Sequence, residues 1–240
     1  MKGRKITSQG ASDREPGPGF SRSAFLFDLE QLNLQVEVMA LKVDEALERS
    51  TEVLLTGDRA TADQVVAGDD AIDAMQVSLT ERCYDLLIRQ NPVASDLRLV
   101  VSVLRIISDL ERTGDLCLRI VKLAPDQPRL ASSAATFGIV RKMADEAKEL
   151  FHAAVRAWAS KDLELAQTLR KRDDAMDAYN AELTGAILRL QGPAAVPAAV
   201  TTLLAGRALE RIADHAVMMG ERLSYLLTGD LGSLSREIGR

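Results

Sequence analysis

The chain has 240 residues, enough for one large domain or two small ones, and its 47% hydrophobic and 27% charged content predicts that it folds. The formal net charge of -5 argues against a protein that holds nucleic-acid phosphates over a broad surface. Aromatic residues make up only 4%, so we expect an aliphatic core, and the sparse glycines and prolines disfavour an all-β fold.

Cysteines and histidines are equally scarce. Two cysteines and two histidines are too few for a disulfide framework or a zinc or multi-histidine metal site, so we expect Cys83 and Cys117 to fill space in the core. No apolar run approaches the ~18–20 residues that span a bilayer. The basic N-terminus lacks the apolar segment of a secretory signal, so we expect a cytoplasmic protein.

In chain order, the polar residues 1–23 predict an N-terminal tail. Long segments of apolar periodicity then predict six helices, at 25–56, 59–90, 95–123, 134–160, 163–191 and 196–227. The interruptions between them contain helix-stopping residues and the N-cap candidates Asp58, Ser95, Ser133 and Asp162. Helices of this length are stabilised by packing on one another, and short connections favour antiparallel bundles.

The two halves of the chain repeat each other. A shift of 104 residues places AGDDAIDAM (67–75) on KRDDAMDAY (171–179), and a shift of 99 places DLERTGD (109–115) on ALERIAD (208–214). Two matches in the same order predict two copies of a three-helix unit. We assign these units to residues 24–127 and 134–228, and residues 229–240 to a C-terminal tail.

Four of the predicted helices carry an acidic pair at i, i+4, with its first member on the apolar seam of the helix. A carboxylate in a packed seam costs several kcal/mol unless a cation compensates it. Because consecutive helices should be antiparallel, the pairs of each unit can face each other. We therefore expect two clusters, formed by Asp69, Asp73, Glu111 and Asp115 and by Asp173, Asp177, Glu210 and Asp214.

The compensating charge has two candidates. Arginine is one, and a hard cation such as magnesium, calcium, manganese or oxidised iron is the other. Arg112 and Arg211 lie between the acidic residues, either in ion pairs or in contact with a partner protein. Asp109 matches Ala208 in the second half, so we leave it out of the cluster, and we interpret His215 as a packed or solvated residue.

The segments SDLRLVVSVLRIISDLERTGD (95–115) and GRALERIADHA (206–216), together with the two DDAID and DDAMD elements, resemble the PhoU family of phosphate-uptake regulators over about residues 25–228. The resemblance implies an all-α fold of two tandem antiparallel three-helix bundles related by pseudo-twofold symmetry. It also implies that the eight carboxylates hold metal clusters, of multinuclear iron or of zinc, magnesium or manganese.

The function that this resemblance implies is negative regulation of phosphate uptake and homeostasis. Such a protein links the ATPase of the phosphate ABC transporter to its sensor histidine kinase, reaches the membrane only through these partners, and is an adaptor rather than an enzyme. The residues agree at one point, since the chain has no nucleophile–base pair and no glycine-rich phosphate loop. Long helices packed side by side present a flat surface, so we expect a homodimer.

Two alternatives stay open. In the first, the same fold is a metal-free scaffold whose acidic pairs are neutralised by arginines. In the second, the chain is a di-metal oxidase of the ferritin-like kind, a class that needs a Glu-x-x-His element in each half. The one formal match, from Glu149 to His152, has no counterpart in the other half, which disfavours this class.

Overall fold

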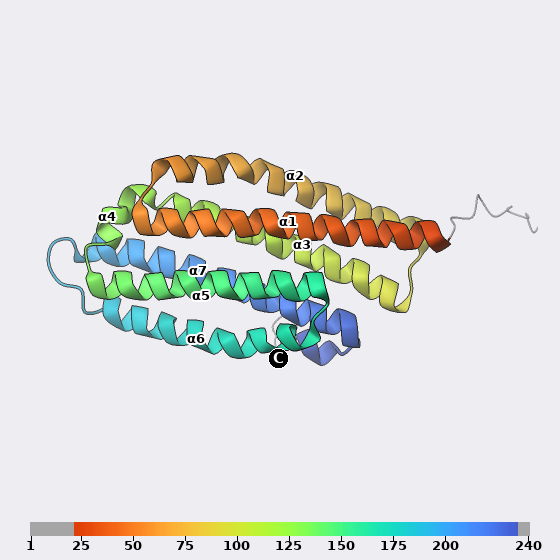
Figure 1. The fold of residues 1–240 in the computed structure, drawn as a ribbon. Helices are drawn as coiled ribbons and strands as arrows, with labels where there is room; N and C mark the ends of the chain where they lie inside the picture. Colours follow the sequence, from red (N-terminus) through yellow and green to blue (C-terminus); the bar gives the residue numbers. More distant parts are fainter. Residues whose placement is uncertain (1–21, 235–240) are drawn as a thin grey trace, which may run out of the picture.

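The computed structural model describes residues 22–234, and this part of the chain is helical without strands (Figure 1). The long helices are α1 (Arg22–Thr56), α2 (Arg59–Gln90), α3 (Ala94–Val121), α5 (Ala134–Ser160), α6 (Leu163–Ile187) and α7 (Ala195–Thr228). The short ones are η1 (Ala124–Asp126), α4 (Gln127–Leu130) and η2 (Leu231–Leu234). The six predicted long helices are therefore confirmed.

The six long helices form two bundles. Helices α1, α2 and α3 pack on one another, as do α5, α6 and α7, and consecutive long helices run antiparallel (Figure 1). The bundles meet where α3 packs on α7 and α1 packs on α5. The predicted fold class, two tandem antiparallel three-helix bundles, is confirmed, and the short helix α4 lies in the connection between the bundles.

Three helices begin at the caps that the sequence predicts. The side chains of Asp58, Ser133 and Asp162 accept hydrogen bonds from backbone N–H groups in the first turns of α2, α5 and α6. The fourth prediction, Ser95, is wrong, because α3 begins at Ala94 after Val93, which makes no side-chain cap. The chain turns into α3 through two left-handed residues, Asn91 at φ 43° and Ala94 at φ 50°.

The two predicted tails are shorter than expected where the structure describes them. Arg22 and Ser23 already belong to α1, and the rest of the predicted N-terminal tail, residues 1–21, lies outside the described residues. In the predicted C-terminal tail, Leu231–Leu234 form η2, whose Leu234 is buried. Residues 235–240 lie outside the described part.

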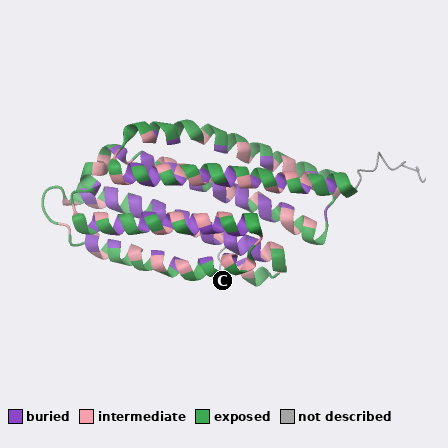
Figure 2. Cartoon of the chain, viewed as in Figure 1, coloured by how far each residue is buried: buried purple, intermediate pink, exposed green. Residues whose placement is uncertain are grey.

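The core is aliphatic and lies between the helices, where Figure 2 shows the buried residues. On α1, Leu29, Leu32, Val36, Val43 and Leu47 recur at spacings of three, four or seven residues and are all buried. Burying each such side chain contributes about 1.5–3 kcal/mol. None of the described helices combines the length and the apolar character needed to cross a membrane.

Both cysteines lie in this core as free thiols, as expected. Burial raises the pKa of Cys83 and of Cys117 to about 12. At pH 8 only about one thiol in ten thousand would then be ionised, and the thiolate is the reactive form. We predict that neither cysteine reacts with a thiol-specific reagent such as DTNB until denaturant is added. Fast labelling of the folded protein would contradict this packing.

Candidate functional site

The first predicted cluster spans α2 and α3. Asp69 of α2 lies over Gly114 of α3, since a Cβ placed on this glycine would be 3.7 Å from Asp69 Oδ1. Gly114 directly precedes Asp115 and follows Glu111 by three residues. The Asp69 carboxylate therefore lies beside the turn of α3 that carries the other acidic pair.

The charges of this cluster act on one another. Burial raises the pKa of Asp69, and the negative charges of Asp73 and Asp115 raise it further, while Lys122 opposes them. Burial likewise raises the pKa of Glu111, with Asp115 and Asp73 adding to the effect. The structure therefore gathers the four carboxylates of Asp69, Asp73, Glu111 and Asp115 within one electrostatic neighbourhood between two helices.

The second cluster spans α6 and α7. Asp173 of α6 is buried at 4% exposure, and Glu210 of α7 is partly buried. Burial raises the pKa of Glu210, with Asp214 and Asp177 adding to the effect and Arg207 opposing it. Carboxylates from the two helices again act on one another, as the repeat predicts.

The negative charge of Glu210 is better compensated than that of Glu111, its equivalent in the first bundle. Glu210 forms an ion pair with Arg207 of the same helix and accepts a hydrogen bond from Asn180 Nδ2 at 3.1 Å. The charge of Arg112 lowers the pKa of Glu111, but the two side chains form no ion pair. Direct contact with an arginine therefore compensates Glu210, and Glu111 has no such contact among the described residues.

The residues have the donor chemistry of a hard-cation site, because carboxylate oxygens are the preferred ligands of such ions. Within residues 22–234, no three or more His, Cys, Asp or Glu side chains converge on one point as the ligands of a single ion do. The clusters are therefore carboxylate-lined surfaces between antiparallel helices, and metal binding remains a proposal.

The seams that carry the acidic residues run along the edge of the buried faces rather than through their middle. Val196 and Leu203 share the apolar seam of α7 with Glu210, at seven-residue spacing, but are 74% and 47% exposed, and Leu97 in the seam of α3 is 41% exposed. The expectation of fully packed seams is wrong at these residues. This edge position is consistent with the partial exposure of Asp69, Glu111 and Glu210.

A buried polar network that the sequence did not reveal joins the bundles at the α3–α7 contact. Asp109 of α3 forms an ion pair with Arg222 of α7. Asp109, Arg222 and His215 are all buried, with at most 6% of each residue exposed. His215 Nδ1 lies 3.1 Å from Asp109 Oδ1. Burial lowers the pKa of His215 to about 4, so the imidazole is neutral at pH 7 and donates Nδ1–H to the carboxylate.

A signal of this network was present in the repeat. With the shift of 99 residues, Asp109 corresponds to Ala208, His215 to Leu116 and Arg222 to Leu123. Three polar residues thus replace three apolar ones at matching positions of α3 and α7. Comparing the halves position by position, rather than motif by motif, would have indicated a polar contact specific to one end of the interface.

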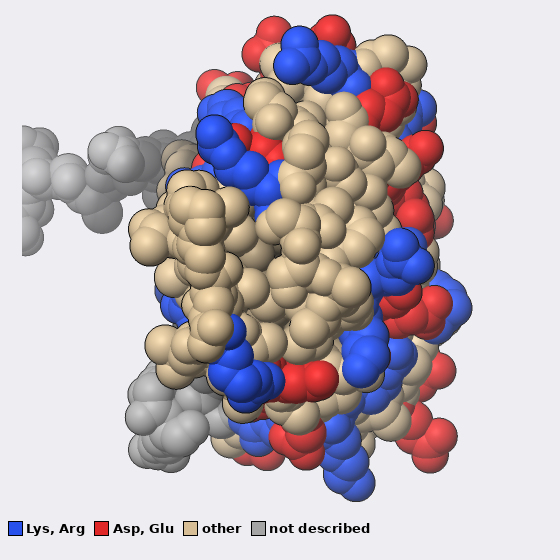
Figure 3. All heavy atoms as spheres, turned by 90° about the vertical axis from the view of Figure 1, so that its left-hand side faces the viewer, with Lys and Arg blue, Asp and Glu red and all other residues tan. Residues whose placement is uncertain are grey.

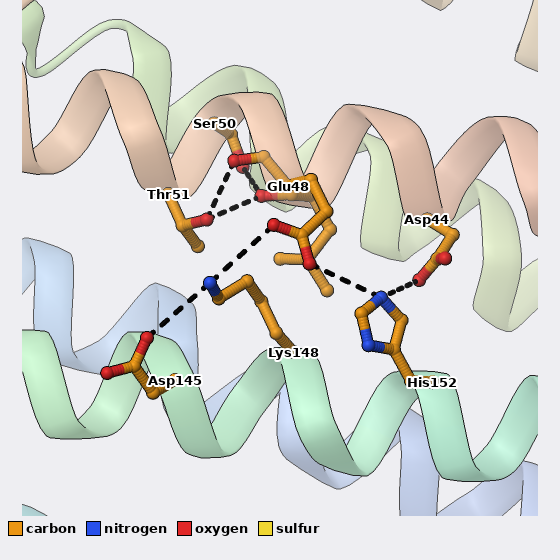
Figure 4. A network of polar contacts seen from close by, with 8 residues as sticks. Asp44, Glu48, Ser50, Thr51, Asp145, Lys148 and His152 are labelled. Atoms are coloured by element: carbon orange, nitrogen blue, oxygen red, sulfur yellow. Dashed lines mark hydrogen bonds and ion pairs between the residues drawn. The ribbon is translucent and has the colours of Figure 1, made fainter.

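A more exposed network connects the bundles at the α1–α5 contact (Figure 4). His152 Nε2 lies 3.0 Å from Asp44 Oδ1 and 3.4 Å from Glu48 Oε1. Lys148 Nζ lies between Glu48 and Asp145, at 3.5 Å and 3.4 Å. Burial raises the pKa of Asp44, and the nearby His152 opposes this. Because these side chains are partly exposed, we assign them a modest share of the bundle contact.

Arg112 and Arg211 are exposed, and neither forms an ion pair with another described residue. This excludes, for the described residues, the interpretation of both as ion-pair partners of nearby acids. Their guanidinium groups lie near the α3–α7 contact, because both positive charges lower the pKa of the buried His215. Contact with a partner protein stays open as their role.

Comparisons with known proteins agree with this architecture. The family model described as the PhoU domain matches residues 36–124 and 140–223. The phosphate-specific transport system accessory protein PhoU homolog 2 of Mycobacterium tuberculosis is 34% identical over 209 residues, covering 87% of this chain and 98% of the relative. The PhoU homolog of Pseudomonas aeruginosa is 30% identical over 207 residues, covering 85% and 86%.

Two solved structures share the fold. The crystal structure of PhoU from Pseudomonas aeruginosa superposes with a TM-score of 0.81 at 28% identity, covering 86% of this chain and 100% of the other. The crystal structure of the phosphate transport system regulatory protein PhoU from Streptococcus pneumoniae gives a TM-score of 0.77 at 27% identity, with 86% and 98% covered.

Proposed function

Because this chain belongs to the PhoU family, we propose that it is a cytoplasmic negative regulator of phosphate uptake. In this role it links the ATPase of the phosphate ABC transporter to the sensor histidine kinase of the phosphate-starvation response. The observation that carries the proposal is the match over nearly the whole length of relatives named as accessory proteins of the phosphate-specific transport system. The chain acts as an adaptor, and we propose no catalytic activity.

The acidic clusters suit a regulatory cation site. Asp69, Asp73, Glu111 and Asp115 would hold ions in the first bundle, and Asp173, Asp177, Glu210 and Asp214 in the second. Bound iron, zinc, magnesium or manganese would supply positive charge to carboxylates that now raise one another's pKa. The chain's own residues provide oxygen donors from two helices at a time, so bound ions would hold these helices together.

One observation favours the metal-free scaffold in the second bundle. The ion pair between Arg207 and Glu210 already neutralises one carboxylate, and Asn180 satisfies one of its oxygens. No comparable contact exists for Glu111 among the described residues. If the two bundles differ in metal binding, we therefore expect the first to bind more tightly.

The regulatory role is tested by deleting the gene and measuring a phosphate-starvation reporter in phosphate-rich medium. We expect the reporter to rise several-fold and to return to its basal level when the intact gene is restored, because the kinase loses its restraint. A phosphate-starved culture of the parent strain confirms that the reporter responds. A reporter that stays at its basal level in the deletion strain would contradict negative regulation.

A further inference from the structure

Four arginines form a straight row along α3. Arg98, Arg105, Arg112 and Arg119 follow one another at seven-residue intervals, so each lies about 10 Å from the next on nearly the same face. Arg98 donates to the Leu226 carbonyl of α7, while the other three are exposed. In a chain with a formal net charge of -5, the row presents positive charge at regular intervals, with the acidic residues Glu111 and Asp115 beside Arg112.

A groove lies beside the row, between α3 and α7. It encloses about 290 Å³, and its apolar surface is formed by Leu116 and Leu123 of α3 and Leu204 of α7. Four cationic residues line the same groove, and one of them, Arg207, is in an ion pair with Glu210. The other three, Arg119, Lys122 and Arg211, form no ion pair with another residue of the range 22–234, so their charges are available to a ligand.

The repeat explains why the groove is open. At the matching place across the α3–α7 interface, Asp109, His215 and Arg222 fill the contact with buried polar side chains. The groove has Ala208, Leu116 and Leu123 at the equivalent positions. The shorter and apolar side chains leave space at this end and line it with hydrocarbon.

The apolar surface continues along α7 beyond the groove. Leu204, Val200 and Val196 recur every four residues and are 53%, 54% and 74% exposed. They lead to the end of the molecule that carries α4 and the α6–α7 connection, where Figure 3 shows a broad uncharged area bordered by charged side chains. An apolar strip flanked by regularly spaced cations is complementary to a helix with an apolar stripe and an acidic flank.

We propose that the groove between α3 and α7 binds an amphipathic helix of a partner protein, with its acidic flank on Arg112 and Arg119. A seven-residue spacing on α3 matches acidic residues one heptad apart on a helix lying alongside it. The inference deepens the proposed adaptor function, on which it rests, by naming the contact face and the chemistry of the partner.

Segments of this chain fit the groove less well. The N-terminal residues 1–21 carry Lys2, Arg4, Lys5 and Arg14 against only two acidic residues, so their charge would be repelled. In a second copy, an acidic and apolar face would have to enter the groove, such as the face of α2 that exposes Asp63, Val66 and Asp70. Such a contact joins two different surfaces and forms an open chain of subunits or a ring rather than a closed twofold dimer.

The binding test uses the full chain and a fluorescent helical peptide of three heptads, with Leu at positions a and d and Glu along one flank. We expect Arg112→Glu/Arg119→Glu to weaken binding by roughly tenfold or more, equivalent to about 1.4 kcal/mol. The control Arg141→Glu/Arg156→Glu makes the same charge change at exposed positions of α5 and should alter binding by less than about twofold. Leu204→Glu should abolish binding, and a peptide with Lys in place of Glu should not bind.

Three results would overturn the proposal: no binding of the Glu peptide, equal affinity of the double variant, or equal binding of the Lys peptide. A change of oligomeric state in Arg112→Glu/Arg119→Glu, measured by light scattering without peptide, would assign the face to a second copy instead. A reporter strain distinguishes failure of the proposed binding surface from failure of the proposed regulatory function. If deletion raises the starvation reporter but the folded double variant represses it normally, the surface is wrong and the regulatory function stands.

Discussion

We expect Asp109→Ala to lower the free energy of unfolding by about 3–5 kcal/mol, because it breaks a buried ion pair by removing one partner. Asp109 is 2% exposed and is the ion-pair partner of Arg222 and the hydrogen-bond partner of His215. All three side chains lie where the two bundles meet. The variant should therefore weaken the junction between α3 and α7 more than the interior of either bundle.

Urea denaturation measures this effect, and the chain offers a matched control. The ion pair between Asp126 and Arg129 is partly exposed, with 35% of the Asp126 side chain open to solvent, so Asp126→Ala should cost less than about 1 kcal/mol. The double variant Asp109→Ala/Arg222→Met removes both buried charges and should recover most of the loss. If Asp109→Ala costs no more than Asp126→Ala, the buried pair does not hold the bundles together.

The second large effect concerns the close approach of α6 to α7. A Cβ on Gly220 would lie 2.6 Å from Leu169 Cδ1 and 2.9 Å from the carbonyl oxygen of Ala166, which is backbone and cannot turn away. We expect Gly220→Ala to destabilise the protein by about 1–3 kcal/mol despite the better helix propensity of alanine. Gly206→Ala should cost less, because the added methyl group would meet the end of the Leu183 side chain rather than backbone.

Gly68→Ala on α2 is the control, because nothing lies within 4 Å of the added methyl group. This variant should stabilise the protein by up to about 1 kcal/mol through helix propensity alone. Denaturant midpoints of the two variants should therefore move in opposite directions. Equal shifts would show that α6 and α7 are not packed as closely as the structure places them, which would also loosen the second carboxylate cluster.

The sequence predicted the helices because their signals are local. Apolar periodicity extends over whole helices, and Asp58, Ser133 and Asp162 cap helices through contacts within three residues. Ser95 failed for a local reason as well, since the turn around Asn91 lets α3 begin two residues earlier than a cap at Ser95 allows. The repeat then indicated which helices face each other, and so which acidic residues gather.

The contact between the bundles was beyond the sequence analysis, because it depends on residues more than a hundred positions apart. Asp109 was set aside because its repeat partner is Ala208, yet that difference is what makes it the partner of Arg222. The exposure of Val196 and Leu203 was also missed. Periodicity identifies the apolar face of a helix but does not tell which part of that face a neighbouring helix covers.

Metal analysis of the purified protein tests most directly whether the two clusters of acidic residues bind cations. Protein prepared without chelator should contain bound metal. The variant Asp69→Asn/Glu111→Gln should lose the metal that the first bundle binds. The control Asp63→Asn/Glu81→Gln, at exposed positions of α2, should lose none. In chelator the cluster variant should be more stable than the parent, since it relieves repulsion between carboxylates.

With added metal the order of stability should reverse, because an ion at about 100 times its Kd stabilises the parent by about 2.7 kcal/mol and cannot do so in the variant. Thermal unfolding with and without iron, zinc or manganese measures this reversal. The account predicts bound metal and a metal-dependent rise in Tm that the cluster variant lacks. A parent protein without metal above the buffer level, whose Tm no added ion raises, would contradict it.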